Sequence, residues 1–188
     1  VEALAAAHAR GAEIVLVSSW NRANVESALW FLREVAPRAP DVAVRIYGSV
    51  AGGVKSADAA LHEKYRDWFA GRVEHIGDIY AHAKLALLPT TSGTGLSIKS
   101  VEAMASGLPL IATPHAFRGM NLDPASLSNV TLVDAAEAFA AALRAAAEAP
   151  TSTRAEREAS ATRAAYEAHF SEAAYCARLA SIAAPLIS

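Results

Sequence analysis

The sequence alternates between short apolar runs and longer segments with helical spacing, and this alternation limits the fold more than any other feature. Continuous apolar runs are typical of strands buried on both faces of a sheet. Such runs occur at Ile14–Val17, Leu85–Leu88 and Leu110–Ala112, and we also predict strands at Val42–Tyr47, Val73–Ile76 and Val130–Val133, which include polar residues. Strands that alternate with helices favour β-α-β units and therefore a parallel sheet. We predict an α/β fold with a single Rossmann-like, doubly wound parallel sheet of about six strands and C-terminal helices.

The segments between and after these runs are expected to be mainly helical. Asn24 precedes apolar residues with helical spacing, so we expect it to cap a helix that ends near Ala36. Ser49–Ser56 contains adjacent glycines and is predicted to be a loop, and Asp78–Ala83 is predicted to form one or two helical turns. The other predicted helices are Asp58–Phe69, Ala135–Ala149, Arg154–Phe170 and Glu172–Ala184, the last of them capped by Ser171.

The amino-acid composition limits the classes of protein to which this chain can belong. The 188 residues are 53% hydrophobic and 19% charged, which predicts one globular domain over residues 12–188, preceded by an N-terminal helix or linker at 1–11. A net charge of −2 gives no sign of a nucleic-acid partner. No apolar run approaches the ~20 residues of a membrane span, so we expect at most peripheral contact with a membrane.

The sequence has one cysteine, Cys176. A single cysteine excludes an internal disulfide and is typical of a reducing compartment, so a cytoplasmic location is expected. Cys176 lies in an alanine-rich helical segment, where we expect it to be buried as a small apolar side chain.

The segment Ser92–Pro109 carries the clearest chemical signal. A predicted strand, a glycine-containing turn and a helix N-terminus follow one another there, and this arrangement favours an anion such as phosphate. Lys99 lies in the first helical turn, and Glu102 follows three residues later, so both side chains share one helix face. The lysine can neutralise a phosphate, and the carboxylate can accept hydrogen bonds from a diol.

The predicted topology gives this segment a place in the fold. In doubly wound sheets, ligands bind outside the carboxyl ends of the strands. The segments expected along that edge are Ser18–Asn24, Gly48–Gly53, Gly77, Pro89–Thr94 and Thr113–Gly119. The pattern therefore indicates a nucleotide cleft at this edge.

Other interpretations of the segment remain open from the residues alone. Lys99 and Glu102 could be a surface pair worth only about 0.2–0.5 kcal/mol. A dinucleotide-binding fingerprint needs glycines after the first strand, and the turn after Val17 has none. A P-loop match lacks its second glycine, because β-branched Ile98 stands there, although Asp134 after the last predicted strand would suit a magnesium ligand.

The stretch from Gly93 to Thr113 resembles the nucleotide-sugar signature of retaining GT-B glycosyltransferases of the family 4 type (glycosyl transferases group 1). Its glycines, lysine, glutamate and Gly-Leu-Pro exit match the pattern G-x-G-x-x-x-K-x-x-E-A-x-A-x-G-x-P of one subgroup. The resemblance extends from about Ala12 to Ala184 and corresponds to the C-terminal, donor-binding half of the two-domain family fold. It implies a chain that binds a nucleotide-sugar as part of a glycosyltransferase.

The resemblance also implies roles for individual residues. Lys99 and Glu102 would be the catalytic pair, with Lys99 on the donor diphosphate and Glu102 on the ribose hydroxyls. The donor-binding set would be Ser18, His75, Gly77, Gly93, Thr94, Gly95, Leu96, Lys99 and Glu102, with His75 and Gly77 near the base and with Arg22, His115 and Arg118 as further candidates. The donor would be UDP-, GDP- or ADP-linked, and neither a cofactor nor a metal would be needed.

Several departures from the family pattern affect these expectations. Thr94 replaces a glutamate that touches the donor sugar in much of the family. Ser18, Ser19 and Asn24 occupy a first loop that is basic in many relatives, which leaves Arg22 as its only charged residue. An N-terminal acceptor-binding domain is expected as a partner, docked on an exposed apolar face, without which the chain would bind donor weakly and transfer no sugar efficiently. A nonenzymatic interaction module with the same fold is the second interpretation.

Overall fold

The computed structural model describes residues 12–187, and the segment 1–11, expected to be a helix or linker, lies outside them. The strands form one sheet in which every pairing is parallel, as predicted. The order is β3-β2-β1-β4-β5-β6. Their bounds are β1 (Glu13–Val17), β2 (Arg45–Tyr47), β3 (Phe69–Gly71), β4 (Ala83–Leu88), β5 (Leu110–Ala112) and β6 (Val130–Leu132). The strand order reverses between β1 and β4, which is where ligands bind in such sheets.

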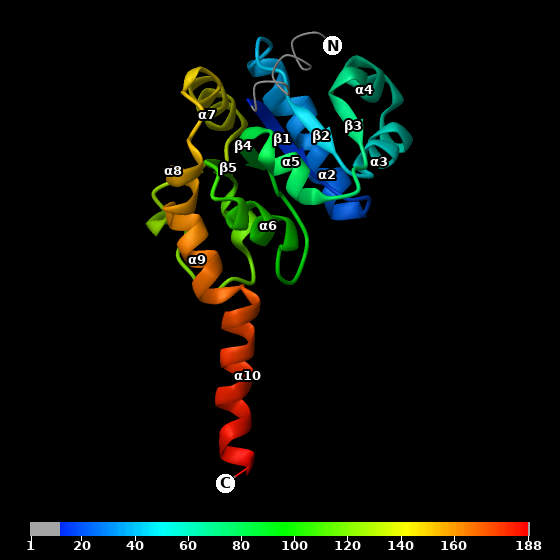
Figure 1. The fold of residues 1–188 in the computed structure, drawn as a ribbon. Helices are drawn as coiled ribbons and strands as arrows, with labels where there is room; N and C mark the ends of the chain where they lie inside the picture. Colours follow the sequence, from blue (N-terminus) through cyan, green and yellow to red (C-terminus); the bar gives the residue numbers. More distant parts are fainter. Residues whose placement is uncertain (1–11, 188) are drawn as a thin grey trace.

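Helices cover one face of the sheet with an apolar layer (Figure 1). They are α2 (Arg22–Trp30), the π-helix η1 (Phe31–Val35), α3 (Val50–Ala57) and α7 (Ala136–Glu148). Side chains alternate along a strand, so Leu16 and Leu85 point to this face and pack in one cluster with Phe31 and Phe139. The rings of Phe31 and Phe139 meet edge to face at 6.0 Å. Each such fully buried side chain contributes about 1.5–3 kcal/mol, which anchors α7 against η1.

The opposite face is covered by the helices that carry the conspicuous sequence motif. They are α5 (Ile76–Ala81), α6 (Ile98–Ser106) and α9 (Ala161–His169). Val15, Ala86 and Leu88 point to this side and pack with Met104 of α6. The central strands β1, β4 and β5 are therefore buried on both faces, which explains why their sequences are mainly apolar.

Shorter elements connect these layers. They are η2 (Ala36–Arg38), α4 (Ala59–Lys64), η3 (Arg66–Trp68), η4 (Pro114–Phe117), η5 (Pro124–Ser126), α8 (Arg154–Glu158) and α10 (Glu172–Ile187). Ser171 precedes α10 and its Oγ accepts from Ala174 N at 3.2 Å, so the predicted cap is confirmed.

The segment Ser49–Ser56, predicted to be a loop, forms most of α3 instead. Val50 and Val54 are fully buried one turn apart and anchor the helix to the core. A Cβ on Gly53 would lie 2.3 Å from Val25 Cγ2, so the glycine lets α3 pack closely on α2. This packing outweighs the ~1 kcal/mol helical penalty of a glycine.

The strand predicted at Val73–Ile76 is also wrong. The strand is β3, a few residues earlier, where Phe69 pairs with Ile46 and Gly71 pairs with Tyr47. Val73 and Ile76 are 42% and 38% exposed, so these two β-branched residues do not belong to a buried strand. Gly77 consequently lies inside α5 rather than at a strand end.

Several helix boundaries differ from the predicted ones. The helix predicted at Asp58–Phe69 is α4 followed by η3, and Phe69 already belongs to β3. Asn21, not Asn24, caps α2, and its side chain accepts from Asn24 N at 2.9 Å. The segment Arg154–Phe170 is two helices, because Ser160 caps α9 through a hydrogen bond from Arg163 N. Asn and Ser have high intrinsic preference for such positions, and several candidates lay close together in the sequence.

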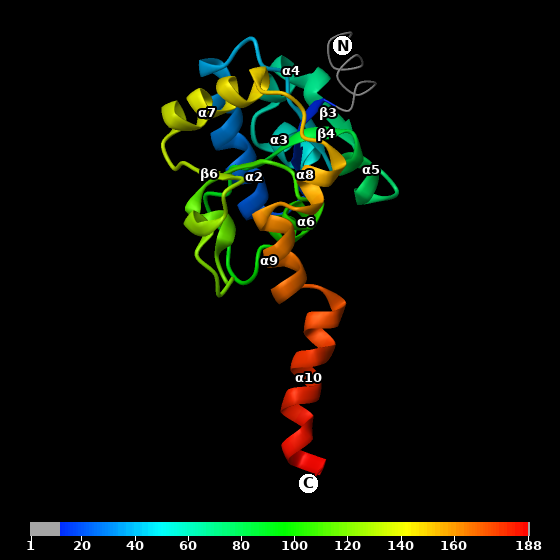
Figure 2. The ribbon, with the colours of Figure 1, turned by 60° about the vertical axis from the view of Figure 1, so that its left-hand side comes forward.

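The last helix, α10, extends away from the body of the molecule in both views (Figures 1 and 2). It is packed against α9 only near its start, and Tyr175, Leu179 and Ile182 are exposed along it. Cys176 is exposed there too, so the expectation that it is buried is wrong. Within residues 12–187, no helix combines the length and the apolar character needed to cross a membrane.

Candidate functional site

A polar cavity of about 480 Å³ lies at the carboxyl ends of the central strands. Loops after β1, β2 and β3 form one wall, and α6 with the loop before it forms the other. The residues that line it are Val17, Ser18, Ser19, Asn21, Asn24, Gly48, Ser49, Arg72, Ile76, Thr94, Leu96, Ser97, Ile98, Lys99, Glu102 and Arg118. We call this the polar cavity.

Lys99 lies in the first turn of α6 and reaches across the polar cavity. Its Nζ donates to Asn24 Oδ1 at 2.8 Å, and Asn24 Nδ2 donates in turn to Ser19 O at 3.0 Å. The amide therefore presents its oxygen to the lysine. Burial lowers the pKa of Lys99 to about 8, and the nearby positive charge of Arg118 adds to this shift. The ammonium is poorly solvated and would be stabilised by an anion.

Arg118 follows the short helix η4 and faces the same cavity from the loop after β5. Its Nη1 donates to His115 O at 3.3 Å. The guanidinium lies against Gly93, where a Cβ would be only 2.9 Å from Nη2. Gly93 has a φ of +115°, a conformation that side chains disfavour, so the backbone favours glycine there.

Hydrogen bonds fix the loop between β4 and α6 to its neighbours. Thr113 Oγ1 donates to Thr90 O at 2.5 Å, and His115 Nε2 lies 3.1 Å from Gly93 O. Ser100 Oγ donates to Ala116 O at 2.6 Å, which joins α6 to η4. Lys99 and Arg118 are thus carried by two segments that are hydrogen-bonded to each other.

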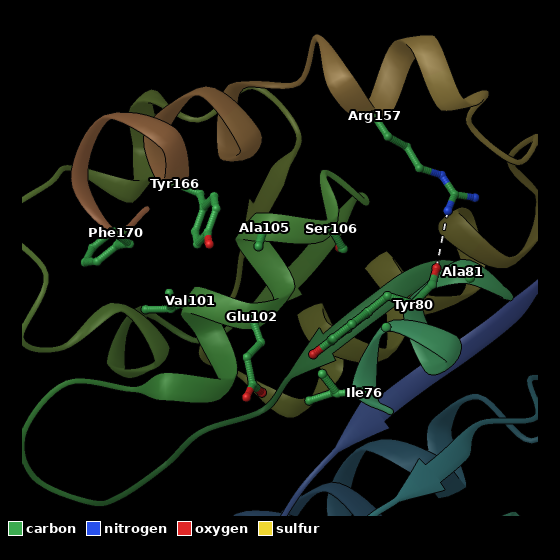
Figure 3. A pocket seen from close by; sticks show the side chains of 11 residues that line it. Ile76, Tyr80, Ala81, Val101, Glu102, Ala105, Ser106, Arg157, Tyr166 and Phe170 are labelled. Atoms are coloured by element: carbon green, nitrogen blue, oxygen red, sulfur yellow. Dashed lines mark hydrogen bonds between the residues drawn. The ribbon is translucent and has the colours of Figure 1, made fainter. Parts of the chain in front are cut away.

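A second cavity, of about 490 Å³, adjoins the first between α5, α6 and α9. Figure 3 shows its lining, which consists of Ile76, Gly77, Tyr80, Ala81, Val101, Glu102, Ala105, Ser106, Arg157, Tyr166 and Phe170. We call it the apolar cavity. Ile76 and Glu102 line both cavities, so the two are continuous at these side chains.

Glu102 lies at this junction, where its carboxylate points toward the side chains of Tyr80 and Ile76 (Figure 3). Burial raises the pKa of Glu102. Burial also raises the pKa of Tyr80, and the charge of Glu102 adds to that effect. A carboxylate in partly apolar surroundings is a strong acceptor for ligand hydroxyl groups.

Two arginines hold the outer wall of the apolar cavity in place. Arg157 donates to Tyr80 O at 3.3 Å and to Ala83 O at 2.9 Å, near the end of α5. Arg163 donates to Ala105 O at 2.6 Å, near the end of α6. Cations at helix C-termini satisfy free carbonyls and complement the dipole, so these bonds fix α8 and α9 against α5 and α6.

The structure brings together some of the residues singled out in the sequence and separates others. Those that line the polar cavity are Ser18, Thr94, Leu96, Lys99, Glu102 and Arg118. Gly77 lines the apolar cavity. Gly93, Gly95 and His115 belong to the loops behind the polar cavity. Arg22 and His75 line neither cavity, and Arg22, with a 93% exposed side chain, is paired with Glu26 at 2.9 Å.

The sequence places Asn24 at the carboxyl edge but predicts it to be a helix cap, so its contact with Lys99 is not expected from it. Arg72 is missed altogether, because the third strand is predicted too late in the chain. Arg72 follows β3 directly, so a correct strand boundary would have placed it at the carboxyl edge. Asp134 follows β6 and lines neither cavity, so the P-loop arrangement does not form among the described residues.

The arrangement can grip an anion between cations and accept hydrogen bonds from hydroxyl groups at Glu102. Across residues 12–187, no group of three or more histidine, cysteine or acidic side chains is placed to hold a metal ion.

Comparisons with known proteins show the family and agree with the fold. A profile of the family described as Glycosyl transferases group 1 matches residues 11–149. No curated protein matches the sequence.

Solved structures resemble the fold at low sequence identity. HepE from Anabaena, crystallised with UDP and glucose, superposes with a TM-score of 0.63 at 17% identity, over 92% of this chain and 48% of HepE. The C-terminal domain of LpcC from Francisella tularensis, a glycosyl transferase group 1 family protein, gives 0.54 at 12% identity, over 82% of this chain and 83% of that domain. WaaG, a glycosyltransferase of lipopolysaccharide biosynthesis, gives 0.54 at 18% identity, over 86% of this chain and 44% of WaaG. The chain spans about half the length of HepE and WaaG.

Proposed function

The chain belongs to the glycosyl transferases group 1 family, and from this premise we propose that it binds the nucleotide-sugar donor of a glycosyltransferase that transfers the sugar with retention of configuration. One observation carries the proposal. Lys99 and Glu102, one turn apart on α6, face one cavity at the carboxyl edge of a parallel sheet. Retention rests on the resemblance of residues 93–113 to the signature of retaining enzymes.

Each side chain has a proposed role that follows from its surroundings. Lys99 neutralises the diphosphate and stabilises charge on the departing nucleotide. Glu102 accepts from the ribose hydroxyls. Ser18, Gly93, Thr94, Gly95 and Leu96 shape the wall around the phosphates. His75 and Gly77 flank Ile76, which lines both cavities, so the backbone of this stretch is proposed to contact the base.

The donor class and the partner are part of the same proposal. UDP-linked sugars are the first candidates, supported by the HepE complexes with UDP and UDP-glucose, and GDP- and ADP-linked sugars follow. We propose a metal-independent reaction in the cytoplasm. A second domain is proposed to bind the acceptor, and exposed Trp20, Leu96 and Ile98 near the polar cavity would suit its docking.

Calorimetric titration of the 188-residue chain with UDP, GDP and ADP tests the proposal. We expect one of them to bind, with an affinity that EDTA leaves unchanged. Lys99→Ala removes a charge-assisted contact of about 1.5–3 kcal/mol and should weaken binding by roughly 10- to 100-fold. Glu102→Ala should also weaken it.

The matched control is Lys64→Ala, because Lys64 is an exposed lysine on α4 that lines neither cavity. It should bind like the wild type. If no nucleoside diphosphate binds, or if Lys99→Ala and Glu102→Ala bind as well as Lys64→Ala, the proposal is wrong.

A further inference from the structure

Two of the cations that line the polar cavity, Lys99 and Arg118, have no acidic partner within ion-pair distance among the described residues. The hydrogen bonds they make go to Asn24 Oδ1 and His115 O. Like charges that face one partly dehydrated space repel each other, and an anion between them removes this cost.

Arg118 has spare donors on its guanidinium. Its Nε is buried and makes no hydrogen bond. Buried donors are almost always paired in folded proteins, so a lone one at a cavity wall is an indication of a missing acceptor. A guanidinium offers a planar fork of N–H groups that matches two oxygens of a phosphate.

The first loop cannot supply this charge. Ser18, Ser19 and Asn24 line the polar cavity there, and they are all neutral. Arg22, the one cation of that loop, points away and is paired with Glu26. Besides Lys99 and Arg118, the lining contains a single further cation, the exposed Arg72.

The order of the side chains indicates which phosphate each would hold. Glu102 lies at the junction with the apolar cavity, and Lys99 lies one turn nearer the start of α6. Arg118 lines the polar cavity and not the apolar one, and it lies against Gly93 in the loop that precedes α6. A nucleoside diphosphate whose ribose meets Glu102 therefore extends past Lys99 toward Arg118.

We infer that Arg118 binds the phosphate farther from the nucleoside, the one that carries the sugar in a nucleotide-sugar donor, and supplies the charge that the first loop lacks. The inference rests on the proposed function. It makes Arg118 a donor-binding residue that distinguishes diphosphates from monophosphates.

The test measures, by calorimetry, the affinities of UDP, UMP and uridine for the wild type, Arg118→Gln, Arg118→Lys and Arg22→Gln; where GDP or ADP binds more tightly, its own monophosphate and nucleoside are used. Arg118→Gln should weaken diphosphate binding by roughly 10- to 100-fold and change monophosphate binding by about twofold or less. Arg118→Lys keeps the charge but lacks the planar fork of N–H groups. Its diphosphate affinity should therefore lie between those of the wild type and Arg118→Gln. Arg22→Gln, an exposed arginine of the first loop, should bind like the wild type.

The outcomes separate the inference from the proposed function. If Arg118→Gln and Arg118→Lys bind the diphosphate like the wild type while Lys99→Ala does not, the inference fails alone. Equal weakening of mono- and diphosphate also overturns it, because Arg118 would then not act on the distal group. If the wild type binds no nucleoside diphosphate, both fail. Thermal unfolding of each variant shows whether the fold is intact, and Arg118→Lys decides the matter if Arg118→Gln does not fold.

Discussion

The two cavities are similar in size and opposite in chemistry. The polar cavity, about 480 Å³, has cations on its walls, whereas the apolar cavity, about 490 Å³, is lined mainly by aliphatic and aromatic side chains. They meet at Ile76 and Glu102. The pair suits a ligand with one charged end and one flat apolar end, and a single carboxylate divides the two.

The two cavities are also held together differently. Loops form much of the polar cavity, and hydrogen bonds such as Thr113 to Thr90 and Ser100 to Ala116 join them. Helices form the apolar cavity, and Arg157 and Arg163 donate hydrogen bonds to carbonyl oxygens near the C-terminal ends of α5 and α6. A change in one support should therefore damage one cavity more than the other, and the following predictions use that difference.

The largest effect is expected from Gly107→Ala, at the end of α6. Gly107 has a φ of +68°, and a Cβ there would lie 2.1 Å from Arg157 O, so α8 would have to move away from α6. We expect the free energy of unfolding to fall by about 2–4 kcal/mol in urea titrations. Nucleotide binding should suffer more than pyrophosphate binding, because only the apolar cavity loses its wall.

Gly71→Ala is the matched control for that prediction. Gly71 has a φ of +77° but no atom within 4 Å of the added Cβ, so it measures backbone strain alone, about 1–2 kcal/mol. Equal losses for the two variants would show that the contact with Arg157 contributes nothing.

The second-largest effect is expected at Glu102, where the two cavities meet. Glu102→Gln replaces the carboxylate by an amide of the same shape and should reduce UDP affinity about tenfold. The loss should be much smaller for 2′-deoxy-UDP, which lacks one hydroxyl group. Calorimetry with both ligands checks this, and the control is Glu137→Gln, because Glu137 is an exposed residue of α7 that lines neither cavity. A loss that is the same for both ligands would place the ribose elsewhere.

The polar cavity should also respond to pH through Lys99. Its pKa of about 8 is below the ordinary 10.5, so between these values the folded chain binds fewer protons than the unfolded chain. Stability without ligand should therefore rise with pH over that window, while UDP affinity should fall about seven- to twentyfold between pH 7 and 9.5 as the lysine loses its charge. Lys99→Met should flatten both profiles, and an unchanged affinity profile in that variant would assign the titration to another group.

The smallest effect is expected from Gly77→Ala, in α5 at the wall of the apolar cavity. A Cβ there meets no atom within 4 Å, and the backbone has ordinary helical geometry. Alanine should stabilise the helix by about 0.4–1 kcal/mol and raise Tm by about 2–4 °C in thermal scans. A lower Tm would mean that the apolar cavity is tighter at this point than the distances indicate.

Much of the fold follows from the sequence because strands buried on both faces must be apolar. Ile14–Val17 and Leu85–Leu88 could be placed from this requirement alone. Local signals failed where tertiary packing decides the outcome. Gly52 and Gly53 predict a loop, yet the space that Gly53 leaves beside Val25 makes a helix possible.

The part of the site that lies on one helix could be predicted from the sequence. The part formed where separate segments of the chain meet was harder to predict. Lys99 and Glu102 follow from spacing on α6, because three residues fix their relative positions. Arg72 comes from the loop after β3 and Asn24 from the first turn of α2, and their approach to the cavity depends on exact strand and helix boundaries. No local pattern indicates that Asn24 Oδ1 would meet Lys99, 75 positions away.

Cys176 lies on the free surface of α10, and it is the only thiol in the sequence. A maleimide dye can therefore be attached at one known position without any mutation. The helix that carries it leaves the body of the molecule, and Cys176 lines neither cavity (Figure 2). A label at this position would report tumbling and encounters of the chain with other macromolecules while leaving both cavities untouched.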